Sequence, residues 1–309
     1  MISIVMPAYN RQACIGSSID SVLTQTFSDF ELLVIDDGST DGTGKIVESY
    51  SDKRIRYYRI ENSGVSVARN FGINVSSGDL IFFLDSDDCW HSRYLELQLD
   101  AFHRHPSASW AATGYFSVDT KFFPLPDWDV IEEKQSFLVS DLPKFWIVDG
   151  GFLTSCVGVR RSVLASLQYH FPPGESVGED MDLWLRLGEI SSLVFTPTKL
   201  MAYRTDGHDS ITKNAKVNAN LLPYLIRLKA RYDRGNVPQR IKVSTRLFIN
   251  HQIISQGRRL LCLGRRLDAV KVMCNAPDAF LQRRGFVTLF LFLLTPKLVR
   301  EFVARRKSS

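Results

Sequence analysis

The chain has few cysteines, and no two of them are close together. Five are spread over 309 residues, at positions 14, 89, 156, 262 and 274. Zinc sites and disulfide frameworks need cysteines in pairs or at regular short spacings, so this pattern argues against both. Isolated cysteines are typical of a protein in a reducing compartment.

Long hydrophobic runs are also absent. Nowhere do 18 uncharged apolar residues follow one another, so we expect no membrane-spanning helix. Met1 leads directly into an apolar run that reaches Pro7, which is not the pattern of a signal peptide. Internal repeats and low-complexity segments are missing too. We therefore expect a cytoplasmic protein, with peripheral contact to the inner face of the membrane left open.

The composition is otherwise ordinary for a globular protein, with 45% hydrophobic and 23% charged residues. The net charge of +5 hides an asymmetry. Residues 256–309 carry 12 Lys and Arg against 3 Asp and Glu, a net of +9, and the remainder carries 26 against 30, a net of −4. This pattern suggests a polyanion such as a membrane surface as a partner of the tail alone. We expect no nucleic-acid partner.

The most informative segment is 80–88, where five apolar residues precede three carboxylates within four positions. The apolar run predicts a strand buried on both faces. Crowded carboxylates repel each other unless a cation or ligand pairs with them. Ligands of open α/β sheets bind outside the carboxyl ends of strands. We therefore interpret Asp85-Ser86-Asp87 as a metal and ligand site, with a solvated acidic loop before the next helix as the alternative.

The first ninety or so residues alternate between strands and helices. Strands are expected over 2–6, 30–35, 55–60 and 80–84, and helices over 15–23, 43–50 and 66–75. This alternation is typical of a doubly wound, mostly parallel α/β sheet, whose strand order local spacing does not give.

The rest of the chain is less regular. We predict a helix over 90–105, a strand over 108–113, a loop-rich insertion over 115–144, a strand over 154–159, a helix from 178, and two short strands over 193–195 and 199–203. Amphipathic helices follow to the end of the chain.

Several motifs, taken together and in order, resemble those of family 2 glycosyltransferases. They are Pro7-Ala8-Tyr9-Asn10, the run from Val34 to Thr43, the run from Gly64 to Asn70, Phe83 to Asp88, and Glu179-Asp180. The resemblance covers roughly the first 210 residues and implies a GT-A fold. It implies a catalytic domain over 1–213, with a nucleotide-sugar-binding half over 1–113 and an acceptor-binding half over 114–213. A basic helical region over 214–309 follows, with a membrane-surface helix over 284–306 as a further hypothesis.

The resemblance also implies which residues hold a nucleotide sugar. They are Pro7, Tyr9, Asp37, Arg69, Asp85 and Ser86. A carboxylate at Asp37 can accept the imide N–H of uracil, which favours a UDP-sugar, while dTDP- and GDP-sugars stay open. Turn and cap residues are the alternative for the Asp36-Asp37 pair, and a surface helix position is the alternative for Arg69.

By the same resemblance, Asp87 and His208 bind a metal ion. Hard oxygen ligands suit Mg²⁺ or Mn²⁺, and such ions bind largely through diphosphate oxygens. A surface loop position is the alternative for His208.

Asp180 is implied to be the general base that takes the proton of the acceptor hydroxyl, which gives single displacement and inversion. Its alternative is an acid that complements the helix dipole, and the two are compatible. Trp184 fits the core better than an acceptor stacking site.

The predicted function is therefore an inverting, metal-dependent hexosyltransferase acting on a glycan or lipid-linked glycan. A sugar nucleotidyltransferase is the competing enzyme class, although the loop at 7–11 lacks the glycines that hold a triphosphate. A non-catalytic nucleotide-sugar-binding protein is the third functional class that we consider. The nine-residue run 286–294, apolar except for Thr288, is too short to span a bilayer. An in-plane membrane contact, packing on the catalytic domain and a homodimer contact therefore remain open for the tail.

Overall fold

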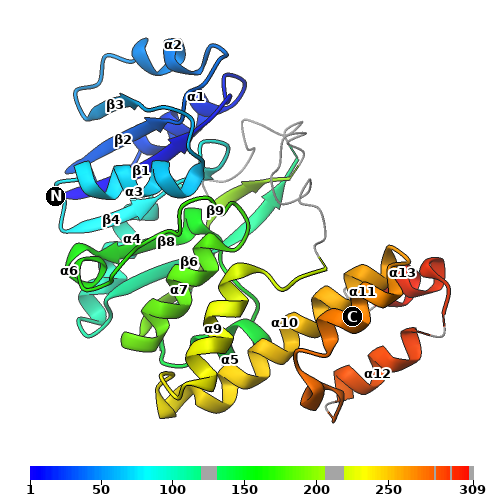
Figure 1. The fold of residues 1–309 in the computed structure, drawn as a ribbon. Coiled ribbons are helices and arrows are strands. Elements are labelled where there is room, and N and C mark those ends of the chain that lie inside the picture. The colour runs from blue at the N-terminus through cyan, green and yellow to red at the C-terminus, as the bar shows by residue number, and fades with distance from the viewer. Residues whose placement is uncertain (120–130, 206–218, 282, 293, 306–309) are drawn as a thin grey trace. The chain divides into compact units, whose positions relative to one another are not determined.

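The computed structural model describes residues 1–119, 131–205, 219–281, 283–292 and 294–305 (Figure 1). The chain divides into two compact units. The N-terminal unit comprises Met1–Leu142 and Gly151–Ile211, and the C-terminal unit comprises Pro143–Gly150 and Thr212–Ser309. Each unit is described by itself.

The N-terminal unit is built on one mixed sheet with the order β3-β2-β1-β4-β8-β6-β9-β5, and β7 pairs with β9. The strands are β1 (Ile2–Ala8), β2 (Phe30–Asp36), β3 (Ile55–Arg59), β4 (Leu80–Phe83), β5 (Cys89–Trp90), β6 (Trp110–Val118), β7 (Phe137–Val139), β8 (Val157–Arg160) and β9 (Leu193–Arg204). The first four strands are parallel, and β8 is antiparallel to β4. This confirms the predicted α/β sheet and supplies the strand order.

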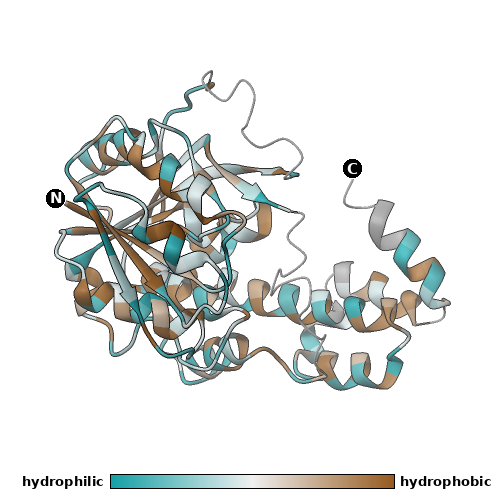
Figure 2. Ribbon diagram, turned by 90° about the horizontal axis from the view of Figure 1, so that it is seen from above, coloured by the Kyte–Doolittle hydropathy of each residue, from teal (hydrophilic) through white to brown (hydrophobic). Residues whose placement is uncertain are grey.

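Helices connect the parallel strands. They are α1 (Ile15–Leu23), α2 (Thr43–Glu48) and α3 (Val65–Val75), followed by α4 (Tyr94–Arg104), α6 (Arg161–Ala165) and α7 (Glu179–Ile190). Every residue of β1 and β2 is buried, because both faces of these strands are covered. In Figure 2 the strand that starts at the N-terminus is mostly brown, while the helices carry both brown and teal residues.

Close packing of α3 on the sheet depends on one glycine. A Cβ at Gly72 would lie 2.4 Å from Cγ1 of Val5, which is inside van der Waals contact. The helix therefore approaches β1 as closely as its backbone allows. This matters for the site, because α3 carries Arg69.

Three local predictions were wrong in detail. The segment 90–105 starts with β5, which pairs with the distant β9, and the helix begins only at Tyr94. Residues 154–156 form a 3₁₀ turn, η2 (Thr154–Cys156), before β8. The two strands expected at 193–195 and 199–203 are one strand, because a register irregularity at Gly114 of β6 accommodates the stretch around Pro197.

The predicted loop-rich insertion 115–144 also contains regular structure. Strand β6 continues to Val118, β7 covers Phe137–Val139, and α5 begins at Leu142 and ends at Val148. Residues 120–130 of the insertion lie outside the described residues.

The C-terminal unit is helical, as the sequence predicts. Besides most of α5, it contains α9 (Pro223–Asp233), α10 (Lys242–Cys262), α11 (Arg266–Met273), α12 (Arg283–Leu291) and α13 (Pro296–Arg305). The long helix α10 packs against α9, α11, α12 and α13. Arg258 Nε of α10 donates a 2.7 Å hydrogen bond to Thr288 Oγ1 of α12, so one face of α12 is fixed on α10. No helix in the described ranges has the length and apolarity needed to cross a bilayer.

Candidate active site

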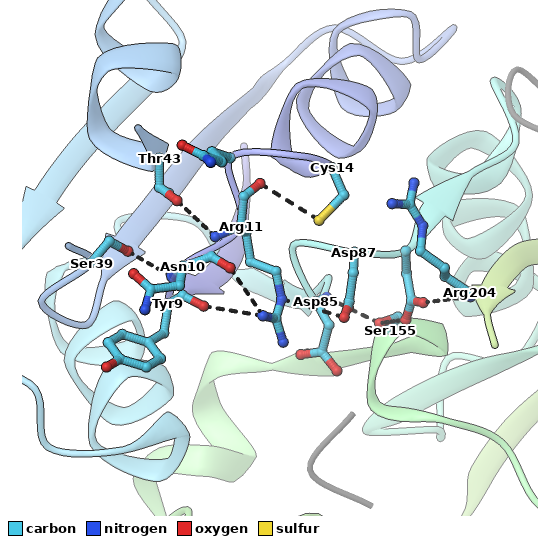
Figure 3. Close-up of polar contacts among 12 residues, drawn as sticks. Tyr9, Asn10, Arg11, Cys14, Ser39, Thr43, Asp85, Asp87, Ser155 and Arg204 are labelled. Carbon is cyan, nitrogen blue, oxygen red and sulfur yellow. Dashed lines mark hydrogen bonds and ion pairs between the residues drawn. The ribbon is translucent and has the colours of Figure 1, made fainter. Parts of the chain in front are cut away.

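The loops that follow β1 and β2 are joined by side-chain to backbone hydrogen bonds (Figure 3). The Asn10 N–H donates to Ser39 Oγ at 3.0 Å, and the Thr40 N–H donates to Asn10 Oδ1 at 2.8 Å. The Arg11 N–H donates to Thr43 Oγ1 at 2.7 Å. Asn10 adopts a positive φ of 51°, which asparagine tolerates better than most residues. The two motifs therefore form one rigid surface at the carboxyl edge of the sheet.

The two acids at the end of β2 are both buried but have different partners. The carboxylate of Asp36, the last residue of β2, accepts hydrogen bonds from the Ser39 N–H at 2.7 Å and the Tyr57 hydroxyl at 2.6 Å. Asp36 is therefore a structural residue.

Asp37 accepts hydrogen bonds from the backbone N–H groups of Ser63 and Gly64, each at 2.8 Å. It thereby joins the loop after β2 to the start of α3. A carboxylate oxygen has two lone pairs, so each oxygen of Asp37 can accept one further hydrogen bond. Tyr9 is 46% exposed beside this surface.

The acidic turn after β4 contains three carboxylates with different environments. Asp85 and Asp87 are partly exposed, whereas Asp88 is buried. Asp88 accepts a 2.6 Å hydrogen bond from the Ser155 hydroxyl, and burial together with the neighbouring Asp87 and Asp85 raises its pKa well above the ordinary value. Asp88 is therefore a structural group, and the turn presents two carboxylates for binding.

Those two carboxylates fit a divalent cation. Burial, and then the negative charge of Asp85, raise the pKa of Asp87, while Arg11 and Arg204 oppose the rise. The Arg11 Nε lies 3.5 Å from Asp87 Oδ2 (Figure 3). Two hard oxygen donors suit Mg²⁺ or Mn²⁺. Within the described ranges no three His, Cys, Asp or Glu residues are grouped to hold an ion by themselves.

Arg69 links the acidic turn to the start of α7. Its guanidinium is 4% exposed, and its two terminal nitrogens pair with Asp85 Oδ1 at 2.7 Å and with Glu179 Oε1 at 2.8 Å. Arg69 also lies over the ring of Phe171, 5.2 Å from its centroid. The arginine predicted to face the donor is thus a buried link between two carboxylates from distant parts of the chain.

Asp180 follows Glu179 in the first turn of α7. Gly178 precedes the helix with a φ of 80°, a left-handed conformation that suits glycine. The two oxygens of Asp180 accept hydrogen bonds from the Thr154 hydroxyl at 3.0 Å and the Met181 N–H at 2.7 Å.

Glu179 is 7% exposed and shares its single arginine with Asp85. Burial, and then the charge of Asp180, raise the pKa of Glu179 from 4.5 to about 7, although Arg69 opposes the rise. One guanidinium among three carboxylates leaves excess negative charge, so Glu179 takes up a proton near neutral pH.

This raised pKa predicts a pH-dependent stability. The folded state binds the proton more tightly than the unfolded state does. The contribution of Glu179 to the free energy of unfolding is therefore complete below pH 4.5 and is lost as the pH rises through about 7. We expect the free energy of unfolding of Glu179→Gln to fall less over this interval than that of the wild type. Urea unfolding at a series of pH values measures the difference.

The exposed Glu132 provides the control, because Glu132→Gln removes a carboxylate that is 84% exposed. This control is expected to keep the wild-type dependence. Equal slopes for Glu179→Gln and the wild type would contradict the assignment.

The remaining predicted residues divide into three groups. Pro7 and Ser86 are buried in β1 and in the acidic turn, so any contact they make with a ligand involves the backbone. His208 lies outside the described residues. Trp184 is 1% exposed and stacks on Trp110 at 5.9 Å, which agrees with its interpretation as a core residue.

Four residues of the site were missed by sequence reasoning. Arg11 directly follows a recognised motif and could have been included from its charge. Arg204 lies at the end of β9, and its backbone N–H donates to Asp88 at 3.3 Å. Thr154 and Ser155 lie about 70 residues after the acidic turn. No local pattern marks these last two, because the β4–β8 pairing brings them to the site.

The architecture is that of the GT-A nucleotide-sugar transferases. S. aureus TarS in complex with UDP-GlcNAc matches with a TM-score of 0.69 over 91% of this chain and 80% of that chain, at 19% sequence identity. The chain belongs to glycosyl transferase family 2, whose family model matches residues 3–167. The family and fold predicted from the motifs are thus confirmed.

Curated relatives agree with this membership. The putative teichuronic acid biosynthesis glycosyltransferase TuaG of Bacillus subtilis is 32% identical over 69% of this chain and 82% of its own length. The Escherichia coli protein named UDP-Glc:alpha-D-GlcNAc-diphosphoundecaprenol beta-1,3-glucosyltransferase WfgD is 46% identical over 32% of this chain and 40% of its own length. Several uncharacterized glycosyltransferases of Rickettsia species are matched over only about a third of their length.

Proposed function

We propose that the chain is an inverting, metal-dependent glycosyltransferase that moves a sugar from a nucleotide-diphosphate donor to a hydroxyl of a glycan or lipid-linked glycan. One observation carries the proposal. Arg69 bonds at once to Asp85 of the acidic turn and to Glu179, the neighbour of Asp180. The donor-side acids and the candidate base therefore lie at one edge of the sheet, as single displacement requires.

The donor would lie along the joined loops. Tyr9 and Asp37 would contact the nucleobase, where a lone pair on Asp37 can accept the imide N–H of uracil. This chemistry favours a UDP-sugar. TarS was solved with UDP-GlcNAc and WfgD is named for UDP-Glc, which supports the same donor class.

The acidic turn would hold the diphosphate end of the donor. Asp87 would bind Mg²⁺ or Mn²⁺, and Asp85, held by Arg69, would contact the ribose or the water shell of the ion. A bound ion of this kind neutralises the charge that develops on the leaving nucleoside diphosphate. Arg11 lies near enough to Asp87 to add positive charge at the same place.

Asp180 would act as the general base. As the acceptor oxygen bonds to the anomeric carbon, its proton passes to Asp180 and the bond to the diphosphate oxygen breaks, with the electron pair leaving on the nucleoside diphosphate. Attack from the face opposite the leaving group inverts the anomeric centre. Polysaccharide synthesis is the proposed setting, because TuaG and WfgD are named for teichuronic acid and for a diphosphoundecaprenol-linked acceptor.

A two-part experiment tests this function. A thermal-shift screen of nucleotide sugars with and without Mn²⁺ identifies the donor, and release of free nucleoside diphosphate on addition of acceptor glycans reports turnover. We expect stabilisation by one UDP-sugar and metal-dependent release of UDP. Release of pyrophosphate from a nucleoside triphosphate and a sugar phosphate would indicate a nucleotidyltransferase instead. Binding without any turnover across acceptors would indicate a non-catalytic binding protein.

The C-terminal unit presents a surface suited to an anionic membrane, and we include this contact, at the inner face of a membrane, in the proposal. On α12, Phe286 and Phe290 are each 56% exposed and Leu289 is 43% exposed, while Thr288 and Leu291 are buried on the other side. A helix of this length lies in the plane of the interface and does not cross it. The net charge of +9 over residues 256–309 complements anionic lipid.

The double variant Phe286→Ser/Phe290→Ser is expected to lose vesicle binding. Full burial of a phenylalanine side chain is worth about 1.5–3 kcal/mol, and each of these two is 56% exposed, so the pair together should lower the partition coefficient at least about tenfold. Co-sedimentation with phosphatidylserine-containing vesicles measures it.

A matched control is available on α10, where Val243 and Leu247 are 74% and 43% exposed with the same spacing of four residues. Val243→Ser/Leu247→Ser is expected to bind vesicles normally. If the α12 variant keeps its partition and instead changes the mass of the protein in solution, the surface is a homodimer contact and the membrane proposal is wrong.

A further inference from the structure

The turn η2 lies opposite the acidic turn because β8 runs antiparallel to β4. The register pairs Leu80 with Arg160 and Phe82 with Gly158. Continued by three residues, it brings Ser155 beside Asp85. The Asp85 N–H donates to Ser155 Oγ at 3.0 Å, and the same hydroxyl donates to Asp88 at 2.6 Å. Ser155 is fully buried, so it fixes the acidic turn from β8.

The preceding residue makes the equivalent contact on the other side of the site. Thr154 is 4% exposed, and its hydroxyl donates to Asp180 Oδ2 at 3.0 Å. The other oxygen of Asp180 accepts the Met181 N–H of its own helix. Without Thr154, the carboxylate of Asp180 would be held only from α7. With it, the carboxylate is also held from η2, whose Ser155 fixes the acidic turn.

We propose that Thr154 is a positioning residue for the general base. The Thr154-Ser155 pair thereby sets the distance between Asp180 and the acids of the acidic turn. This inference rests on the proposed function, because it takes Asp180 as the base. Thr154 acts through Asp180 and does not itself contact the substrate. Its hydroxyl orients the carboxylate toward the acceptor.

The test compares two substitutions with different chemistry. Thr154→Val keeps the shape of the side chain and removes the hydroxyl, whereas Thr154→Ser keeps the hydroxyl. A hydrogen bond to a charged group corresponds to a loss of about ten- to a hundredfold in kcat for the Val variant. We expect the KM for the donor to change little, because donor contacts are untouched. The Ser variant should recover most of the activity.

The split between kcat and KM separates positioning from a general structural role. Thr154→Val should lower kcat at an unchanged KM for the nucleotide sugar and an unchanged melting temperature, and Thr154→Ser should restore kcat. The control is Thr196→Val, which removes another buried hydroxyl, one with no hydrogen-bond partner in the described part of the chain. It should keep the wild-type kcat and KM.

The outcomes distinguish this inference from the proposed function. If Asp180→Asn transfers sugar at a near-normal rate, the base assignment fails and the inference fails with it. If Asp180→Asn is inactive while Thr154→Val keeps the wild-type kcat, the inference alone is wrong. A Val variant that loses thermal stability and affinity for the nucleotide sugar together with kcat would also overturn it. In the Asp180→Asn background, Thr154→Val should cause no further loss.

Discussion

Asp180→Asn is expected to reduce sugar transfer by about a hundred- to ten-thousandfold, which is the usual contribution of a general base. The amide oxygen can still accept a hydrogen bond from Thr154, so the start of α7 should remain intact. Donor binding should be unchanged, because the donor is proposed to lie on the loops after β1, β2 and β4. Single-turnover kinetics give the rate, and calorimetry gives the donor affinity.

Asp100→Asn is the control for this variant. Asp100 lies on α4 with a side chain that is 42% exposed, where it pairs with Arg104. Its substitution should leave both transfer and donor binding at wild-type values. Transfer by Asp180→Asn within a few-fold of the wild type would exclude Asp180 as the base. A loss of donor affinity equal to the loss of rate would instead assign Asp180 to binding.

Asp87→Ala should abolish the metal dependence of donor binding. The wild type is expected to bind the nucleotide sugar more tightly with Mn²⁺ than with a chelator present, because the ion bridges the carboxylate and the diphosphate. The variant should show the weaker, metal-independent affinity under both conditions. Calorimetric titration with and without Mn²⁺ measures the ratio of the two affinities.

A matched carboxylate lies at the opposite edge of the sheet. Asp52 precedes β3 and pairs with Arg54, so Asp52→Ala changes the net charge equally without touching the carboxyl edge. This control should keep the metal dependence of the wild type. An unchanged Mn²⁺ effect in Asp87→Ala would remove Asp87 from the metal site.

The sequence predicted the parts of the fold that depend on local pattern. The four parallel strands and their helices follow from apolar runs, helical spacing and turn residues, and they appear close to the expected bounds. The motifs identified the family correctly for the same reason, since each is a short segment at a strand or helix end. The residues of the acidic turn were recognised because like charges after a buried strand are chemically conspicuous.

Long-range pairing was not predictable in the same way. Strand β5 forms only because β9, more than a hundred residues later, pairs with it. The acids of the pairs Asp36-Asp37 and Asp87-Asp88 look alike in sequence, but their partners come from the tertiary structure. Asp36 bonds to Tyr57, whereas Asp37 bonds to the backbone at the start of α3. Asp88 is buried on Ser155, whereas Asp87 is partly exposed. Thr154 carries no local signal, because its importance comes from a partner 26 residues away.

The β4–β8 pairing has a consequence for the design of chimeras. Strand β8 is the boundary between the parallel strands and the remainder of the sheet. A chimera that exchanges the half proposed to bind the acceptor would cut through that boundary. Such a graft must bring its own complement to the dipeptide at 154–155, because that dipeptide bonds to acids on both sides of the junction. Modular exchange is therefore constrained by two hydroxyl groups, and not only by the loops that meet the sugar.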